Sequence, residues 1–424
     1  MLSIKNEILQ GSYNDCFEML YSGIEPAQKR YANAVDEFES IFGTDREVSL
    51  FSAPGRTEVG GNHTDHQHGC VLAGSVNLDV IAVVSANNDG IVRIKSEGYD
   101  MDTVNLLELE VKEKEYGHAS ALIRGMLAQM KANGYNISGF DAYTTSNVLK
   151  GSGLSSSAAF EVLIGVIVSN LYNNDKTGAV EIAKMAQKAE NIYFGKPCGL
   201  MDQMASAVGG FTSIDFNDPG EPIIEKVDFD LAAHGYSLCI INTGGNHANL
   251  TDDYAAITRE IKTVAEFFGK QVLRDISEND FYSNIKNLRT KCGDRAVLRS
   301  LHFFNDNRRA IDEKNALKNN DFEQFLSLVN ESGNSSFKYL QNVFSASNPS
   351  EQGLSLALAI SEKVLAGRGA HRVHGGGFAG TIQCFVPNDV LNVYLSEMKA
   401  VFGDESCYVL NIRPVGGTAV TKNK

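Results

Sequence analysis

A run rich in glycine and serine at residues 151–157 is the first candidate for chemistry, and it directly precedes an apolar stretch at residues 158–172. Glycine lets the backbone approach a ligand closely, and the N-terminus of a following helix offers unpaired N–H groups to an anion. The serine hydroxyls could add hydrogen-bond donors or an oxygen ligand for Mg²⁺. The run predicts a phosphate-binding loop, although a turn with a serine N-cap explains it equally well. Its residues are Gly151, Ser152, Gly153, Leu154, Ser155, Ser156 and Ser157.

A second cluster of polar residues lies at residues 53–69. Arg56 could stabilise a phosphoryl group or a nearby carboxylate, because a guanidinium group pairs with both. Asp65 and the histidines around it could bind sugar hydroxyls, since a carboxylate accepts hydroxyl protons. Metal ligation by the three histidines is an alternative, but their spacing, H-x-x-H-x-H, matches no standard helical or zinc-finger pattern. The cluster therefore predicts a ligand-binding loop.

A third candidate is Asp202, which stands between apolar residues in the segment CGLMDQM at 198–204. A carboxylate in such surroundings needs a partner, or desolvation raises its pKa. The segment follows Glu190, which ends an alanine-rich stretch with helical periodicity. Asp202 is therefore expected to have a charged or hydrogen-bonding partner, and a helix-capping role is the alternative.

The secondary structure expected to position these residues changes along the chain. Residues 1–45 read as helical, and residues 48–115 contain short apolar runs that indicate strands. Helices are expected at 119–133, 158–172 and 179–194, with strands at 140–145, 211–214 and 236–242. The second half is richer in helices, at 253–268, 296–313, 321–329 and 354–366, and strands are expected at 381–385 and 407–412. An acidic, proline-containing stretch near 215–235 suggests two domains, at 1–220 and 221–424.

The composition narrows the classes of partner. The formal net charge is −14 and no basic patch is visible, so binding to nucleic acid is not expected. No apolar run approaches the length of a membrane span, and the first ten residues do not read as a secretory signal. The seven cysteines are scattered and odd in number, which fits reduced thiols in a cytoplasm. We therefore expect a cytoplasmic protein without a membrane partner.

Four segments together resemble the GHMP small-molecule kinases, and galactokinases most closely. They are APGRTEVGGNHTDH at 53–66, GSGLSSSA at 151–158, CGLMDQ at 198–203 and HGGGFAGT at 374–381. Their order and spacing agree with the family across residues 50–420. The resemblance implies an α+β fold, in which two domains place the active site in the cleft between them.

The resemblance also implies a role for each segment. Asp202 would be the base that accepts the proton of the sugar's anomeric hydroxyl, and Arg56 would keep it ionised and stabilise charge on the phosphoryl group. Ser157 and Glu190 would hold Mg²⁺, and the backbone of residues 151–157 would cradle the phosphates of ATP. The sugar would be contacted by Asn62, His63, Asp65, Gly199 and Tyr254.

Two departures from the galactokinase pattern bear on the sugar site. Asn62 stands where the family has a glutamate that accepts a hydrogen bond from the sugar's C6 hydroxyl. An amide donates as well as accepts and carries no charge, so Asn62 would tolerate a C6 carboxylate that a glutamate repels. Glu58 stands where the family has an asparagine, and the sequence offers no physical reason for that change.

The leading hypothesis is an ATP-dependent sugar 1-kinase that converts galactose to α-D-galactose 1-phosphate. A kinase for a C6-modified relative such as galacturonate is the alternative. A non-catalytic sensor of sugar and ATP would be expected to lack part of the serine run, which is intact here. A kinase for a non-sugar alcohol fits the segments at 53–66 and 198–203 poorly. The expected partners are a sugar and ATP, in a monomer or a weak homo-oligomer.

Overall fold

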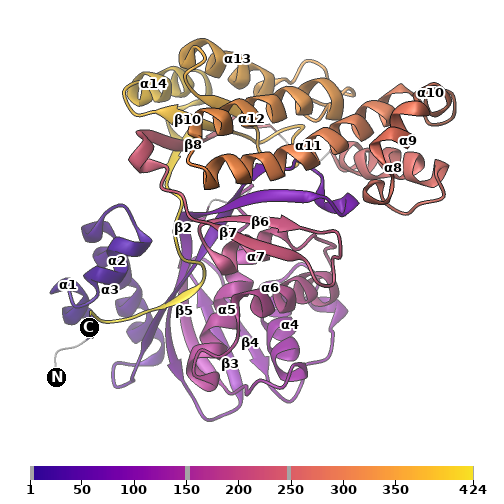
Figure 1. The fold of residues 1–424 in the computed structure, drawn as a ribbon. Helices are drawn as coiled ribbons and strands as arrows, with labels where there is room; N and C mark the ends of the chain where they lie inside the picture. The colour runs from indigo at the N-terminus through magenta and orange to yellow at the C-terminus, as the bar shows by residue number, and fades with distance from the viewer. Residues whose placement is uncertain (1–3, 149–152, 246–249, 424) are drawn as a thin grey trace.

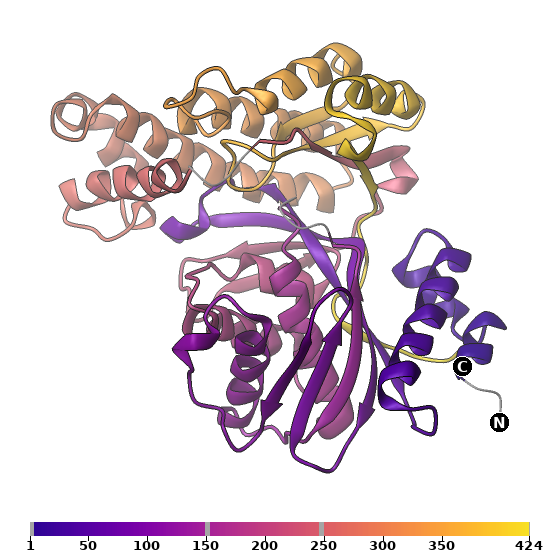
Figure 2. The same ribbon diagram turned by 180° about the vertical axis from the view of Figure 1, so that it is seen from behind.

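The structure is a computed structural model that describes residues 4–148, 153–245 and 250–423. Two sheets with their helices are stacked one above the other, and three N-terminal helices stand beside the lower one (Figure 1). The last described residues return to these helices, where the Asn423 N–H donates to the Ser12 carbonyl at 2.7 Å, and the view from behind shows the same arrangement (Figure 2). The expected α+β fold is confirmed.

The lower sheet has the strand order β12-β1-β2-β5-β3-β4, and β6 pairs with both β2 and β7. The pairs are antiparallel except for β3 with β5. The strands are β1 (Ser49–Gly60), β2 (Cys70–Ala86), β3 (Ile91–Ser96), β4 (Met101–Asn105), β5 (Phe140–Ser146), β6 (Phe211–Asp215), β7 (Ile223–Val227) and β12 (Thr418–Val420).

Helices cover both faces of this sheet. Successive residues of a strand point to opposite faces, so Leu50 and Ile81 pack against the N-terminal helices while Phe51 and Ala82 join the main core on the other side. Burial on both faces explains why these strands read as nearly continuous apolar runs. The N-terminal helices are α1 (Ile4–Leu9), α2 (Asn14–Leu20) and α3 (Ile24–Phe42). The helices of the main core are α4 (Ala119–Ala132), α5 (Ser156–Asn173), α6 (Ala179–Lys188) and α7 (Met201–Val208).

The upper sheet has the order β11-β8-β10-β9, and all its pairs are antiparallel. In β8, Cys239 and Ile241 face α13 and α14, whereas Leu238 and Ile240 face the main core. The strands are β8 (Tyr236–Asn242), β9 (Ala370–Val373), β10 (Thr381–Pro387) and β11 (Cys407–Leu410). The helices are α8 (Thr251–Phe267), α9 (Glu278–Ser283), α10 (Ile285–Cys292), α11 (Asp294–Lys318), α12 (Phe322–Ser335), α13 (Gly353–Leu365) and α14 (Leu391–Phe402).

Short helical turns complete the fold. Two are π-helical, η3 (Ala189–Phe194) and η7 (Ser336–Leu340). The 3₁₀ turns are η1 (Asp65–Gln67), η2 (Glu113–Glu115), η4 (Ala232–His234), η6 (Leu273–Asp275) and η8 (Asp404–Ser406). No helix in the described ranges combines the length and the apolar character needed to cross a membrane.

The chain passes between the two sheets twice. Strand β7 still pairs with β6 in the lower sheet, and the chain enters the upper sheet only at β8. After β11 it returns, and β12 pairs with β1 through Leu50 and Val420. The last residues therefore belong to the lower layer, a contact between chain ends that no local pattern reveals.

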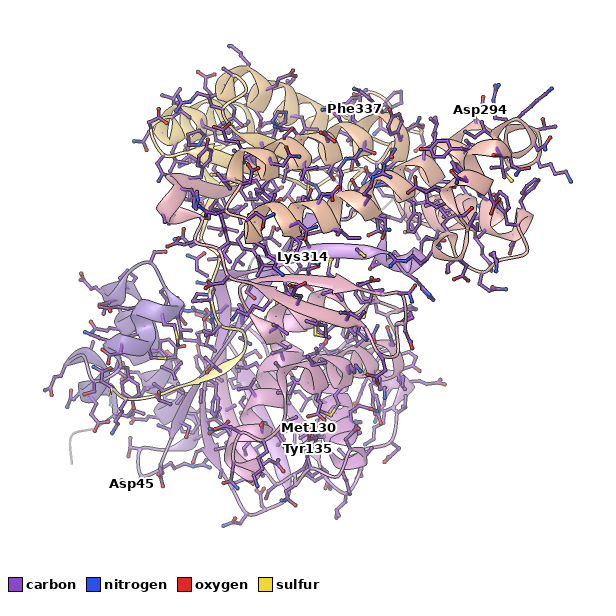
Figure 3. All side chains as sticks on the ribbon, in the orientation of Figure 1. Asp45, Met130, Tyr135, Asp294, Lys314 and Phe337 are labelled. Atoms are coloured by element: carbon purple, nitrogen blue, oxygen red, sulfur yellow. The ribbon has the colours of Figure 1, made fainter. Side chains whose placement is uncertain are left out.

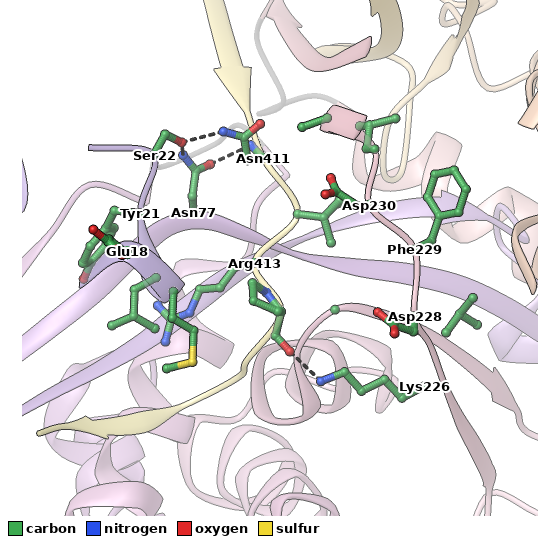
Figure 4. A pocket seen from close by; sticks show the side chains of 18 residues that line it. Glu18, Tyr21, Ser22, Asn77, Lys226, Asp228, Phe229, Asp230, Asn411 and Arg413 are labelled. Atoms are coloured by element: carbon green, nitrogen blue, oxygen red, sulfur yellow. Dashed lines mark hydrogen bonds between the residues drawn. The ribbon is translucent and has the colours of Figure 1, made fainter. Parts of the chain in front are cut away.

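A cavity of about 840 Å³ lies at these two crossings, beside the N-terminal helices (Figure 4). The Lys226 ammonium group donates to the Pro414 carbonyl and so joins the two crossing segments. The backbones of Asn77 and Asn411 are also bonded, through Asn77 N–H to Asn411 O at 3.1 Å. Further out, Lys314 of α11 reaches down to Glu225 of β7 at 3.0 Å (Figure 3). The two layers are thus tied at several points away from the site described next.

Candidate active site

An arginine–aspartate pair forms the centre of the candidate site. Arg56, near the end of β1, directs Nε and Nη2 to the two carboxylate oxygens of Asp202, each at 2.7 Å. Asp202 lies in the first turn of α7, and its side chain is 28% exposed, whereas that of Arg56 is 9% exposed. Such a two-point contact fixes both groups, because it sets the plane of the guanidinium as well as its distance. The pair brings together two residues that are 146 positions apart.

This environment holds Asp202 in its charged form. Burial by itself would raise the pKa of the Asp202 carboxyl, but the charge and hydrogen bonds of Arg56, with the hydroxyl of Ser155, keep that pKa below its ordinary value. The side chain does not cap α7, since the N-cap position is Leu200 and no side-chain cap bond is present there. The capping alternative for Asp202 is therefore not what the structure shows.

The serine-rich run begins α5 and lies directly against this pair. Ser155 takes the N-cap position with φ of 58°, yet it makes no cap bond and donates instead to Asp202 Oδ2 at 2.6 Å. The Arg56 guanidinium donates through Nη1 to the Gly153 carbonyl, and the Arg56 backbone N–H donates to the Leu154 carbonyl at 3.0 Å. The run passes so close to β1 that a Cβ at Gly55 would lie 2.8 Å from the Leu154 carbonyl oxygen. Two of its predicted nucleotide-binding residues, Gly151 and Ser152, lie outside the described residues.

The predicted metal ligands Ser157 and Glu190 are neighbours. The Ser157 hydroxyl donates to Glu190 Oε1 at 3.2 Å, and the exposed side chain of Lys196 reaches the same oxygen at 3.0 Å. The other oxygen of Glu190 accepts a bond from Gln203 Nε2 at 2.7 Å. Glu190 lies in the π-helical turn η3, one residue after the junction with α6. Such a local widening of a helix often marks a functional position. The expected single helix at 179–194 is thus interrupted at its most relevant residue.

A hydroxyl and a carboxylate fit Mg²⁺, which usually takes one or two protein oxygens and completes its shell with phosphate and water. Lys196 would have to leave the Glu190 oxygen, which its exposed side chain permits. In the described residues no three His, Cys, Asp or Glu side chains gather in a way that could hold a metal by themselves. The histidines at 63, 66 and 68 therefore form no such group.

The loop at residues 61–69 joins β1 to β2 and carries the predicted sugar contacts. His63 has a φ of 58°, and its Nε2 lies 3.0 Å from the Gly376 carbonyl, so this nitrogen carries the proton. Burial lowers the pKa of His63 to about 4, so the ring is neutral near pH 7 and its Nδ1 is an acceptor. Asp65 faces the backbone of Gly199, where a Cβ would lie 2.6 Å from the Asp65 Oδ2 atom. The structure thus brings His63, Asp65 and Gly199 to one region.

Tyr254, on α8, lies against the glycine-rich segment near the C-terminus. Its hydroxyl donates to the Gly377 carbonyl at 2.8 Å, and its ring meets that of Phe378 edge-on at 5.3 Å between centroids. A Cβ at Gly376 would lie 2.6 Å from the Tyr254 ring. The tyrosine therefore supports the loop at residues 375–377, and that loop needs glycine where the ring comes so close.

Comparisons with known proteins agree with this arrangement. The family model "GHMP kinases N terminal domain" matches residues 121–210, and "Galactokinase galactose-binding signature" matches residues 36–86. A galactokinase of Glaesserella parasuis is 31% identical over 360 residues, which cover 83% of this chain and 88% of the relative. A galactokinase of Streptomyces coelicolor is 30% identical over 82% of this chain and 86% of its own length. The chain belongs to the galactokinase family.

Solved structures show the same relationship. A Lactococcus lactis galactokinase complexed with galactose superimposes with a TM-score of 0.76, at 26% identity over 92% of this chain and 99% of the other. A Methanococcus jannaschii mevalonate kinase, at 15% identity, has a TM-score of 0.62 over 86% of this chain and 98% of its own, which shows the common fold.

Asn62, one of the two departures from the galactokinase pattern, does not lie where the sequence suggested. The side chain is fully buried, and both amide hydrogens and the amide oxygen are bonded to other parts of the protein. One amide hydrogen goes to Glu58 Oε1 at 2.8 Å. The expected contact between Asn62 and a sugar C6 group is therefore not supported, because the amide has no bonding capacity left for a ligand.

The same bond accounts for Glu58, the other departure. Glu58 Oε1 accepts from Asn62 and also from the buried guanidinium of Arg372, at 2.7 Å. The amide and the carboxylate thus form a pair, and Arg372 of β9 compensates the carboxylate from the upper layer. The changes to Glu58 and Asn62 are therefore linked, because the two side chains bond to each other.

Several residues beside the site were not identified as functional candidates from the sequence. Gln203 Nε2 bridges the buried carboxylates of Glu190 and Glu161, at 2.7 and 3.1 Å. Burial, together with the charge of Glu190, raises the pKa of Glu161 well above its ordinary value. His374 contacts Thr57 Oγ1 through Nε2 at 3.1 Å. Gln203 and His374 lie inside the recognised segments, so their position in those segments is the signal that could have found them.

Proposed function

We propose that this protein transfers the γ-phosphoryl group of ATP to the C1 hydroxyl of galactose, forming α-D-galactose 1-phosphate and ADP. Membership of the galactokinase family supports the reaction. The observation that carries the assignment of residues is the contact of Asp202 with both Arg56 and Ser155 at the start of α5. It places an ionised carboxylate, a cation and the candidate phosphate loop in direct contact.

In the proposed mechanism Asp202 accepts the proton of the C1 hydroxyl as that oxygen attacks phosphorus. Arg56 keeps the carboxylate ionised and offers positive charge to the phosphoryl oxygens between donor and acceptor. The N-terminus of α5, with the hydroxyls of Ser155–Ser157, binds the phosphates. Phosphoryl transfer depends mostly on such positioning and charge compensation, so no covalent intermediate with the protein is required.

Ser157 and Glu190 would hold Mg²⁺, which neutralises phosphate charge when bound. His63 and Asp65, both in the 61–69 loop, would bind hydroxyl groups of the sugar. The neutral His63 ring offers the lone pair of Nδ1 to a hydroxyl, because Nε2 already donates to Gly376. The Asp65 carboxylate accepts up to two hydroxyl protons.

The test of the function is the release of ADP from Mg-ATP in the presence of one sugar at a time. The panel is galactose, galacturonate, N-acetylgalactosamine, glucose and no sugar, with the phosphorylated product identified by NMR. We expect turnover with galactose and a phosphate on C1. Turnover confined to galacturonate, or no turnover with any sugar, would refute the proposal.

Substitution of Gly199 by alanine tests the place of the sugar. The new Cβ would lie 2.6 Å from Asp65 Oδ2, so the Asp65 carboxylate must move. We expect KM for galactose to rise roughly tenfold while kcat changes by less than about threefold, because a small misplacement of a substrate-binding group weakens the contact. Steady-state kinetics measure both constants.

Gly178→Ala is the matched control for this variant. A Cβ at Gly178 meets only Glu181 Oε2 at an ordinary 3.4 Å, and the backbone there is extended. KM should stay at the wild-type value. An unchanged KM in Gly199→Ala would remove Asp65 from the sugar site.

Glu190→Gln tests the metal assignment. The substitution keeps the shape of the side chain but removes the charge that Mg²⁺ requires, so the Mg²⁺ concentration for half-maximal rate should rise at least about tenfold. A titration with Mg²⁺ at constant ATP measures it. Lys196→Met, which removes the cation that shares the Glu190 oxygen, should leave that concentration unchanged or lower it. Equal Mg²⁺ dependence in Glu190→Gln and wild type would contradict the assignment.

A further inference from the structure

Three successive carbonyl groups of the loop at residues 375–377 accept hydrogen bonds from side chains of other segments. The Gly375 carbonyl accepts from Asn62 Nδ2 at 2.9 Å, and the Gly376 carbonyl lies 3.0 Å from His63 Nε2. The Gly377 carbonyl accepts from Tyr254. Two of the three donors are neighbours in the 61–69 loop of the lower layer, so the two loops are joined at the place where the sugar contacts are proposed.

Asn62 is the centre of this junction. Besides Gly375, its amide donates to Glu58, and its Oδ1 accepts from Ser336 Oγ at 3.2 Å and Asn342 Nδ2 at 2.9 Å. Its backbone is held as well, since its N–H donates to Asp306 at 2.8 Å and its carbonyl lies 2.9 Å from His302 Nε2. A fully buried polar group with every donor and acceptor used contributes rigidity and cannot also serve a ligand.

We infer that Asn62 is a positioning residue for galactose phosphorylation: it joins the 61–69 loop to the 375–377 loop and thereby sets the geometry of His63 and Asp65. The inference rests on the proposed sugar contacts of those two residues. It assigns specificity at the sugar site to the loop geometry that Asn62 maintains, and not to a contact between its amide and the sugar.

Charge explains why residue 62 is an amide. Glu58 Oε1 lies 2.8 Å from the Asn62 amide nitrogen and is paired with Arg372. A carboxylate at residue 62 would face the carboxylate of Glu58 and the carbonyl oxygen of Gly375, with both donors lost. Arg372 already compensates Glu58 and also acts on the buried carboxyl groups of Asp306 and Glu313, so a further buried carboxylate at residue 62 would be poorly compensated.

The first experiment is therefore a pair of substitutions and their combination, with KM and kcat measured for galactose. Asn62→Asp should raise KM about tenfold or more with kcat changed less than about threefold, because two buried donors are lost and a like charge is added. Glu58→Gln combined with Asn62→Asp restores one carboxylate and one amide beside Arg372. The double variant should have a KM for galactose close to that of the wild type. If KM of the double variant rises by the product of the two single-variant factors, the pairing of Asn62 with Glu58 is refuted.

The second experiment separates positioning from direct contact. KM of wild type and Asn62→Asp is compared for galactose and its 2-, 4- and 6-deoxy analogues. Positioning acts through His63 and Asp65, which together bind more than one hydroxyl, so it predicts that removal of any single hydroxyl leaves part of the factor in place. A direct contact predicts that the factor disappears for the one analogue that lacks the contacted hydroxyl, and that result would refute the inference.

Two further variants keep the test decisive. If Asn62→Asp does not fold, Ser336→Ala removes one bond to Asn62 Oδ1 and should give a smaller rise in KM, which again no single analogue abolishes. A rise that disappears for one analogue, or an unchanged KM, would contradict the inference. Asp65→Asn reports on the proposed sugar contacts themselves: unchanged KM there would refute those contacts, whatever the behaviour of Asn62.

Discussion

Asp202→Asn should lower kcat by about three orders of magnitude while galactose still binds. The substitution keeps the size of the side chain and removes the group that accepts the C1 proton, and general-base catalysis is worth roughly 10²–10⁴ in rate. The loss should appear in kcat rather than in KM, because the proton moves only as the reaction proceeds. Single-turnover kinetics with ATP and galactose, together with calorimetric titration of galactose, measure the two properties separately.

A matched control is available on the same protein. Asp215 also pairs with an arginine, because Arg274 Nη2 donates to both of its carboxylate oxygens, at 2.9 and 3.1 Å, and its side chain is 28% exposed, as is that of Asp202. Asp215→Asn weakens a pair that includes neither Arg56 nor Asp202 and should leave kcat close to the wild-type value. Equal turnover of Asp202→Asn and wild type would show that another group accepts the proton.

Arg56→Met should lower kcat by about two to three orders of magnitude, the usual effect of removing a charge-stabilising donor at a reaction centre. It should also change the pH dependence. In the wild-type protein Arg56 outweighs burial and keeps the pKa of Asp202 below its ordinary value of 3.8, so the base stays ionised at any pH above that range. Without Arg56, burial dominates and the pKa rises.

The sign of the resulting effect follows directly. The proton acceptor of Arg56→Met is lost as pH falls through the raised pKa, so the acid limb of kcat/KM should move to higher pH than in the wild type. Arg56→Lys keeps a charge but not the two-point contact, and its acid limb should lie between the other two. Rate profiles from pH 4.5 to 8 in constant ionic strength measure this shift. An acid limb at the same pH in all three proteins would contradict the role of Arg56.

The sequence by itself determined the family, the segments of the site and most of the elements. Its periodicity and glycine punctuation predicted the helix that became α4, expected at 119–133 and found at Ala119–Ala132. The serine-rich run, Arg56 and Asp202 were recognised as chemical candidates because their residue types and spacing are unusual for surface or core. Local patterns suffice for such features, since each depends on neighbours within a few residues.

The tertiary structure alone decided which partner each candidate has. Ser155 was expected either to cap a helix or to bind phosphate, and the structure directs its hydroxyl to Asp202. Asn62 was expected to contact a sugar, and the structure directs its amide to Glu58 and the Gly375 carbonyl. These outcomes depend on residues from 4 to 313 positions away, which a local reading does not combine.

The physical reason is that a polar side chain takes whatever donor or acceptor the fold places within about 3 Å, and burial makes that choice binding. For Asn62, that partner set includes Ser336 and Asn342, which are 274 and 280 positions further along the chain. The type of residue 62 therefore suggested a chemistry, while the packing of the upper layer on the lower one determined that this chemistry is internal. The state of Asp202 is instead determined within the lower layer, where Arg56 of β1 leaves its carboxylate charged and partly exposed.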